Sequence, residues 1–153
     1  MSSHLVRESL DVYSLREAVG KLAQELGFPR RERAELLIVV SELCSNIVKY
    51  GVRGSLELEP HIDDVHGIGI AIVARDIGPA FRDFKMALQD GYDDQGPIDP
   101  GVLMKRGGLG IGLGAVRRLT DSLSIDYGPE GKSIRVVRYL RRPPRKSSLP
   151  PRR

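Results

Sequence analysis

Residues 42–51 read ELCSNIVKYG, a pattern typical of the end of an amphipathic helix. Leu43 and Ile47 have the spacing of a buried face. Glu42 and Asn46 stand one helical turn apart and share a different face. A carboxylate beside a carboxamide on such a helix has two interpretations. The pair is either a solvated polar stripe or one wall of a ligand site, and the pair alone does not decide between them.

The length and composition of the chain are those of an ordinary globular protein. The 153 residues suffice for about one domain with a real core, and 41% are hydrophobic while 29% are charged. No apolar run approaches the roughly 20 residues of a membrane span, and the N-terminus lacks the pattern of a signal peptide. The single cysteine, Cys44, cannot form an intrachain disulfide. We therefore expect a cytoplasmic protein.

The net charge of +4 is concentrated in the C-terminal tail. Residues 141–153 carry six Lys or Arg and no acid, which leaves 18 basic against 20 acidic side chains, or −2, in residues 1–140. A folded part with this balance does not predict nucleic-acid binding. The tail is also rich in proline, so we expect a domain at 1–140 followed by a disordered basic tail at 141–153.

The hydrophobic pattern predicts alternating groups of helices and strands. We expect helices at 14–27, 30–50 and 82–91, a fourth ending near Asp121, and strands at 54–60, 67–75, 122–128 and 132–140. Ser14 and Glu17 form a capping-box pattern, and Gly27 is a helix stop. Residues 4–9 are a candidate for a further edge strand. This order predicts a two-layer α/β sandwich, with helices on one face of a mixed, mainly antiparallel sheet.

A second polar site lies in ARDIGPA, at residues 74–80. Asp76 follows an apolar strand directly, and a carboxylate placed there can accept a hydrogen bond from an adenine amino group. Gly78 would let a base approach the backbone closely. The alternative is a simple turn, because Asp, Gly and Pro are turn residues.

A third site is the run GGLGIGLGAV at residues 107–116, which holds five glycines in eight residues. Glycine destabilises a helix interior by about 1 kcal/mol relative to alanine, so such a run needs a reason. Backbone amides at a helix start bind phosphate well, whereas the alternative is a merely flexible turn. The run is not a P-loop, and the loop-like sequence before it disfavours the dinucleotide-binding motif that GIGLGA would otherwise match.

Taken together, these three blocks resemble those of the GHKL superfamily of ATPases, which includes histidine kinases, type II topoisomerases, Hsp90 and MutL. ELCSNIVKYG resembles the N box, DIGPA the G1 box and GGLGIGLG the G2 box, in the same order. Over about residues 5–141 the chain is most similar to the small serine/threonine kinases of bacterial anti-sigma and stressosome switches. The resemblance implies binding of ATP and Mg²⁺.

The resemblance also implies roles for particular residues. Glu42 is the expected general base, Asn46 the expected Mg²⁺ ligand and Asp76 the acceptor for the adenine amino group. Ser133, where the family often has Thr, would support Asp76 or a bound water. The remaining expected nucleotide contacts are Lys49, Gly78, Lys105, Arg106, Gly108, Gly110, Gly112 and Leu113. Lys105 and Arg106 end the segment 91–107, which fits the lid that the family closes over ATP.

The sequence departs from the family pattern in two places. Ala80 stands where the G1 box usually has a final glycine, and the lid segment looks longer than in the compact switch kinases. Both differences bear on lid closure and on the choice of partner, and neither removes an expected ligand.

The function that the resemblance implies is phosphorylation of Ser or Thr on a STAS-domain antagonist of an anti-sigma factor. The resemblance also suggests that the released kinase activates a phosphatase. The alternatives are an anti-sigma factor that sequesters a sigma factor, and a module that binds ATP without transferring phosphate. We expect no nucleic-acid or membrane partner.

Overall fold

The computed structural model describes residues 2–6, 11–50, 54–77, 92–93, 96–97, 112–129 and 131–141, with the backbone alone at 2–6, 49–50, 92–93 and 96–97. The elements in chain order are β1 (Ser2–Val6), α1 (Asp11–Glu25), α2 (Arg30–Tyr50), β2 (Gly54–Asp63), β3 (Gly67–Asp76), β4 (Tyr92–Asp93), β5 (Gly96–Pro97), α5 (Leu113–Arg118), β6 (Ser122–Gly128) and β7 (Gly131–Tyr139).

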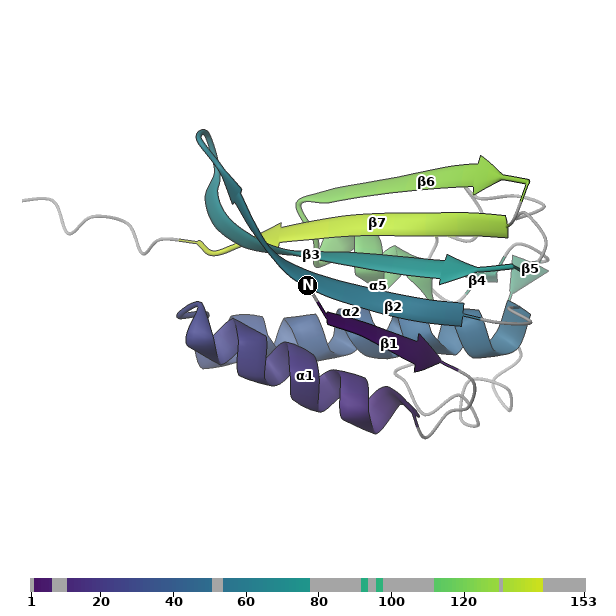
Figure 1. The fold of residues 1–153 in the computed structure, drawn as a ribbon, viewed down its shortest axis with the longest axis horizontal. Helices are drawn as coiled ribbons and strands as arrows, with labels where there is room; N and C mark the ends of the chain where they lie inside the picture. The colour runs from purple at the N-terminus through teal and green to yellow at the C-terminus, as the bar shows by residue number, and fades with distance from the viewer. Residues whose placement is uncertain are drawn as a thin grey trace, which may run out of the picture.

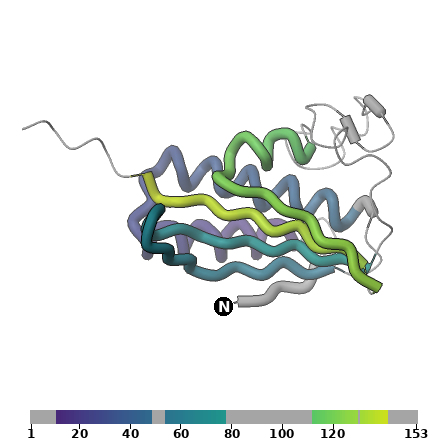
Figure 2. Tube along the Cα trace, turned by 90° about the horizontal axis from the view of Figure 1, so that it is seen from above, coloured from purple at the N-terminus to yellow at the C-terminus, as the bar shows by residue number. Residues whose placement is uncertain are grey.

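These elements form two layers, as Figure 1 shows. One layer is a five-stranded sheet in the order β1-β2-β3-β7-β6, and the helices lie together on one of its faces (Figure 2). Each neighbouring pair in this sheet is antiparallel, so the described strands include no parallel pair. The expected sandwich is thus confirmed. The antiparallel β6–β7 hairpin after α5 is not the βαβ unit that a dinucleotide-binding motif would need.

Helix α1 buries Leu15, Val19 and Ala23, which recur every four residues along one face. It begins at Asp11, whose carboxylate suits the positive end of the helix dipole. The capping box expected at Ser14 is therefore wrong, because Ser14 lies inside the helix. The stop at Gly27 is confirmed: this residue has φ 88°, and the amide of Phe28 donates to the carbonyl of Ala23 at 2.9 Å.

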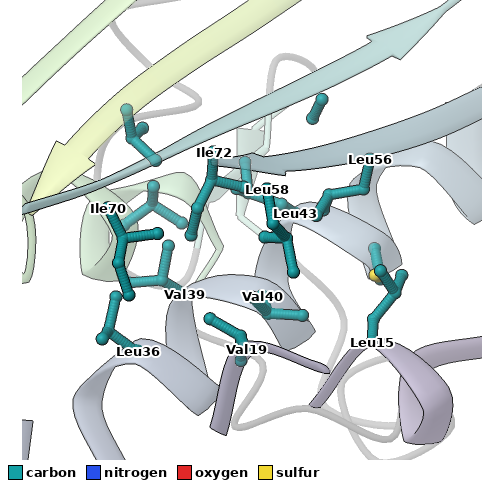
Figure 3. Close-up of a cluster of buried hydrophobic side chains, with 14 of the residues drawn as sticks. Leu15, Val19, Leu36, Val39, Val40, Leu43, Leu56, Leu58, Ile70 and Ile72 are labelled. Carbon is teal, nitrogen blue, oxygen red and sulfur yellow. The ribbon is translucent and has the colours of Figure 1, made fainter. Parts of the chain in front are cut away.

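The core lies between α1, α2 and α5 on one side and the inward face of the sheet on the other. Alternate residues of β2, β3 and β7 point into it, as expected for strands with one buried face. Figure 3 shows how closely the side chains of the helices and of β2 and β3 meet. The labelled members of this cluster are Leu15, Val19, Leu36, Val39, Val40, Leu43, Leu56, Leu58, Ile70 and Ile72.

A buried ion-pair network joins the sheet to α2 and α5. Arg138 of β7 is 3% exposed and approaches Glu35 at 2.7 Å and Glu32 at 3.6 Å. Its guanidinium also donates to the carbonyl of Leu119, just after α5, at 2.7 Å. A guanidinium presents several donors in a fixed plane, so it can hold several acceptors together. Arg138 therefore ties the beginning of α2 and the end of α5 to the same strand.

A second polar cluster fixes the tip of the β2–β3 hairpin, which bends away from the sheet in Figure 1. Asp63 accepts hydrogen bonds from the amides of Val65 and His66 and, at 2.7 Å, from the hydroxyl of Tyr139. The His66 ring stacks on Tyr139 with centroids 4.7 Å apart. The backbone bond from His66 contributes most to lowering the pKa of Asp63, followed by the Tyr139 bond, which also raises the pKa of Tyr139.

Strand β2 extends beyond its predicted end at residue 60 and continues through Asp63. None of the helices that the structure describes is long and apolar enough to cross a membrane. The expected helix at 82–91 lies outside the described residues, as does the tail beyond Arg141. The division at residue 140 therefore stays a prediction.

Replacement of Arg138 by methionine tests the buried network. Arg138→Met leaves Glu32 and Glu35 without their buried cation, so we expect the free energy of unfolding to fall by about 3 kcal/mol. Urea denaturation measures it. Arg135→Met on the same strand is the matched control, because Arg135 is less buried and lies on the other face of the sheet. Equal losses in the two variants would contradict the role given to Arg138.

The Asp63 cluster predicts a pH-dependent contribution to stability. Because folding lowers the pKa of Asp63, its contribution is complete above the unfolded pKa of about 3.9 and is lost as the pH falls through the lower folded pKa. We therefore expect Asp63→Asn to lower the melting temperature more at pH 7 than at pH 3. Thermal denaturation at both pH values measures the difference, and an equal reduction at both would contradict it.

Candidate functional site

Helix α2 carries the first two candidate residues. Glu42 is 3% exposed, whereas Asn46 is half-buried one turn further along the helix. Around them the helix packs its apolar side chains into the core, so its orientation is fixed by Leu43 and Ile47. A buried carboxylate needs compensating polar contacts, which makes a merely solvated stripe a poor description of Glu42.

The glycine-rich turn reaches Glu42 directly. The backbone amide of Gly112 donates to Oε2 of Glu42 at 3.2 Å, across 70 positions in the sequence. Gly112 has φ 68°, a conformation that favours glycine, and it immediately precedes α5. Leu113, the first residue of α5, is buried in the core and fixes the start of that helix. Two of the three predicted blocks therefore meet at one hydrogen bond.

The remaining block, ARDIGPA, contributes Asp76, the last residue of β3. Its carboxylate does not lie in a turn open to solvent. It accepts a hydrogen bond from the ammonium group of Lys132 at 2.9 Å, and the side chains of Lys132 and Asp76 are 1% and 3% exposed. The strand register places these two residues opposite each other on β3 and β7. Asp76 is thus a buried ion-pair partner as well as a candidate ligand for a base.

Ser133 does not lie opposite Asp76 in the β3–β7 register. It pairs in register with Arg75, one residue before Asp76, so its side chain leaves the strand on the other face from that of Lys132. No described contact joins Ser133 to Asp76. The described residue that contacts Asp76 is Lys132, and the expected role of Ser133, support of Asp76 or of a bound water, stays a prediction.

Lys132 was missed in the sequence, although a signal for it exists. Lys132, Ile134, Val136 and Arg138 share the inward face of β7, with a basic residue at each end of an apolar pair. A lysine on a face that packs into the core must find a carboxylate. The alternation of inward- and outward-facing residues along β7 could therefore have predicted a carboxylate partner for Lys132. It could not have predicted which carboxylate.

A hollow of about 590 Å³ lies at the end of the sheet where β3 finishes. Asp76 and Lys132 belong to its lining, together with residues of β2 and β6. Its volume is within the usual range for ligand pockets. Among the described residues in this lining none comes from a helix, so Glu42 and Asn46 lie outside it. The hollow therefore accounts for the Asp76 end of the candidate site and not for all of it.

Several predicted site residues lie outside the described part of the chain. These are the side chain of Lys49 and residues Gly78, Lys105, Arg106, Gly108 and Gly110. Of the expected lid at 91–107 the structure describes the backbone of β4 and β5, which pair with each other. The roles of these residues stay predictions.

Cys44, two residues from Glu42, can be excluded as a nucleophile. Its thiol is buried, and burial, with a smaller contribution from the charge of Asp11, raises its pKa to about 12. The reactive form of cysteine is the thiolate, which this thiol does not reach near neutral pH. Among the side chains that the structure describes, no group of three or more His, Cys, Asp or Glu is arranged to hold a metal ion.

Comparisons with known proteins agree with this arrangement. The sequence model of the histidine kinase-like ATPase domain matches residues 7–138. The chain is 32% identical over 132 residues to serine/threonine-protein kinase RsbT of Bacillus subtilis (strain 168), a match that covers 86% of this chain and 90% of that protein. It is 24% identical over 129 residues to serine-protein kinase RsbW of Bacillus cereus (strain G9842), covering 84% and 77%.

These matches confirm the resemblance that the N, G1 and G2 boxes indicated in the sequence, and they extend over both layers of the fold. The chain belongs to the histidine kinase-like ATPase domain family.

Proposed function

We propose that the protein transfers a phosphoryl group from ATP to a serine or threonine of a small STAS-domain protein in a partner-switching pathway. The enzyme class follows from the family and its relatives: the chain is an ATP-dependent serine/threonine-protein kinase. The STAS-type substrate is the finer part of the proposal, and it rests on the similarity to switch kinases described above.

The observation that carries the proposal is the hydrogen bond from the Gly112 amide to Glu42. It brings the carboxylate of α2 to the turn whose backbone amides are suited to phosphate. A proton acceptor beside a phosphate-binding turn is what transfer to a hydroxyl requires. Neither group alone would distinguish a kinase from a protein that only binds nucleotide.

The described residues fit Mg·ATP at two points. Asp76 supplies a buried acceptor for the amino group of the base, and Asn46 supplies a half-buried carboxamide oxygen, a ligand type that Mg²⁺ accepts. The amide of Gly112 donates to Glu42, so contact with the phosphates falls to the expected glycines Gly108 and Gly110, which lie outside the described residues. Bound Mg·ATP would supply the phosphoryl group, and its Mg²⁺ would neutralise part of the charge on the phosphates.

The protein contributes position and one proton acceptor to the reaction. Glu42 would take the proton from the Ser or Thr hydroxyl as that oxygen bonds to the γ-phosphorus of ATP. The bond from this phosphorus to the β–γ bridging oxygen breaks in the same step, and ADP leaves with that oxygen. The amides of the turn orient the phosphates. Burial of Glu42 excludes water from the carboxylate, which favours transfer to the protein hydroxyl over hydrolysis.

Replacement of Glu42 by glutamine tests the proton acceptor. Glutamine keeps the shape and can still accept from the Gly112 amide, so we expect nucleotide affinity to stay within about threefold of the wild type, while phosphotransfer falls at least about 100-fold. Transfer of ³²P from labelled ATP to purified STAS-domain proteins measures the rate. Glu25→Gln, at the exposed end of α1, is the control. Undiminished transfer in Glu42→Gln would refute the role of Glu42, and transfer to other proteins alone would refute the STAS-type substrate.

Replacement of Asp76 by asparagine tests recognition of the base. The variant loses the charged acceptor, so we expect the affinity for a non-hydrolysable Mg·ATP analogue to fall at least tenfold, about 1.4 kcal/mol or more. Isothermal titration calorimetry measures it. Asp126→Asn is the matched control, because Asp126 is exposed and also lines the hollow. Unchanged binding by folded Asp76→Asn would place the base elsewhere.

A further inference from the structure

Strand β6 forms one outer edge of the sheet, and in the described part of the chain it pairs with β7 alone (Figure 1). Edge strands expose unpaired backbone groups, and natural proteins usually protect them with proline, lysine, a bulge or a short length. The seven residues of β6, SLSIDYG, include neither proline nor lysine. They keep one unbroken register with β7 from Ser122 to Gly128. This edge therefore has the properties of a surface that pairs with another strand.

The contacts of β7 show which backbone groups of β6 point away from the sheet. The carbonyl of Val137 accepts from the amide of Asp121 at 2.8 Å, so the backbone groups of this β7 residue point toward β6. Its partner in the register is Ser122, whose backbone groups therefore point toward β7. Because these directions alternate along a strand, Leu123 and Ile125 turn their amides and carbonyls to the open edge. Among the described residues none forms a backbone hydrogen bond with Ile125 at this edge.

The side chains of β6 alternate between an apolar and a polar face. Leu123 and Ile125 pack against the core but stay half-buried, and Tyr127 on the same face is 51% exposed. Ser124 and Asp126 lie on the opposite face and are exposed. The apolar row is thus incompletely covered at the edge of the sheet. A further strand at this edge would bury more of it, which is favourable.

A second copy of β6 matches this edge in one antiparallel register. With Ile125 opposite Ile125 of the second copy, the two strands overlap along their whole length, and these central residues exchange both backbone hydrogen bonds. Leu123 then faces Tyr127 of the second copy, and the hydroxyl of Ser124 faces the carboxylate of Asp126. Each of these two pairs occurs twice because the contact is symmetric. A register centred on Asp126 would instead place two carboxylates opposite each other.

We propose that two copies of this protein pair through β6 and join their five-stranded sheets into one continuous sheet. The two-fold axis stands perpendicular to the sheet at Ile125, so the helices of both copies lie on the same side. Asp126 also lines the hollow that Asp76 borders, so Ser124 of the second copy stands beside that hollow. The interface is small, so we expect a dissociation constant of about 1–100 µM.

Sedimentation velocity of the full chain without nucleotide, at about 2–200 µM, measures the association. We expect the wild type to change from monomer to dimer over this range. Ser124→Asp places two carboxylates opposite each other at two symmetric positions, so we expect the dissociation constant to rise at least about tenfold. Adding Asp126→Lys converts both contacts into pairs of opposite charge, and we expect association to return to within about threefold of the wild type. Ser14→Asp, which adds the same charge at an exposed position of α1, is the matched control.

Each outcome decides for or against the pairing. Folded wild type that stays monomeric throughout this range would overturn the proposal and leave the edge to a strand of a different protein. Equal weakening by Ser124→Asp and Ser14→Asp would place the contact on another surface. No recovery in the double variant would overturn the register and the proposal with it. Ser124 lies opposite Arg135 of its own chain, so an aspartate there gains a cation and the fold should tolerate it. The samples hold no nucleotide, so these outcomes leave the proposed kinase function to its own tests.

Discussion

The inward face of β7 places two positive charges in the interior of the protein, and much of the structure follows from how they are neutralised. Lys132 and Arg138 stand at opposite ends of this face, with Ile134 and Val136 between them in the core. Each charge needs carboxylates at close range, because a buried unpaired ion is far more costly than a paired one. Lys132 takes Asp76 from the neighbouring strand, whereas Arg138 takes Glu32 and Glu35 from α2. Strand β7 therefore helps to fix both the end of β3 and the position of α2.

This arrangement explains how segments distant in sequence form one site. Arg138 holds the beginning of α2 and the end of α5, and the apolar core holds the rest of both helices. The other end of α5 then lies where the Gly112 amide reaches Glu42. Asp76 is fixed separately through β3 and β7. Glu42, Gly112 and Asp76 are thus carried by elements that pack into the core or pair within the sheet.

Much of the fold could be predicted from local pattern. Helix α1 and strands β2 and β7 bury residues at a regular spacing, and β3 is buried almost continuously, as its apolar run indicates without the structure. The order of the three motifs predicted the family because motif order is a property of the chain. Pairing was harder. Lys132 faces Asp76 and Ser133 does not, which depends on a one-residue register between strands 56 positions apart. The capping box failed because Asp11 offered an earlier start than Ser14.

The position of Cys44 gives the protein an internal reporter. It is the single cysteine of the chain, and it lies on the buried face of α2, between Glu42 and Asn46. Burial keeps the thiol protonated and out of reach of solutes. Its chemical modification therefore has to wait for α2 to separate from the core. The labelling rate of this one sulfur would count such openings, so ligand-induced tightening of the helix that carries Glu42 and Asn46 can be followed without adding a probe.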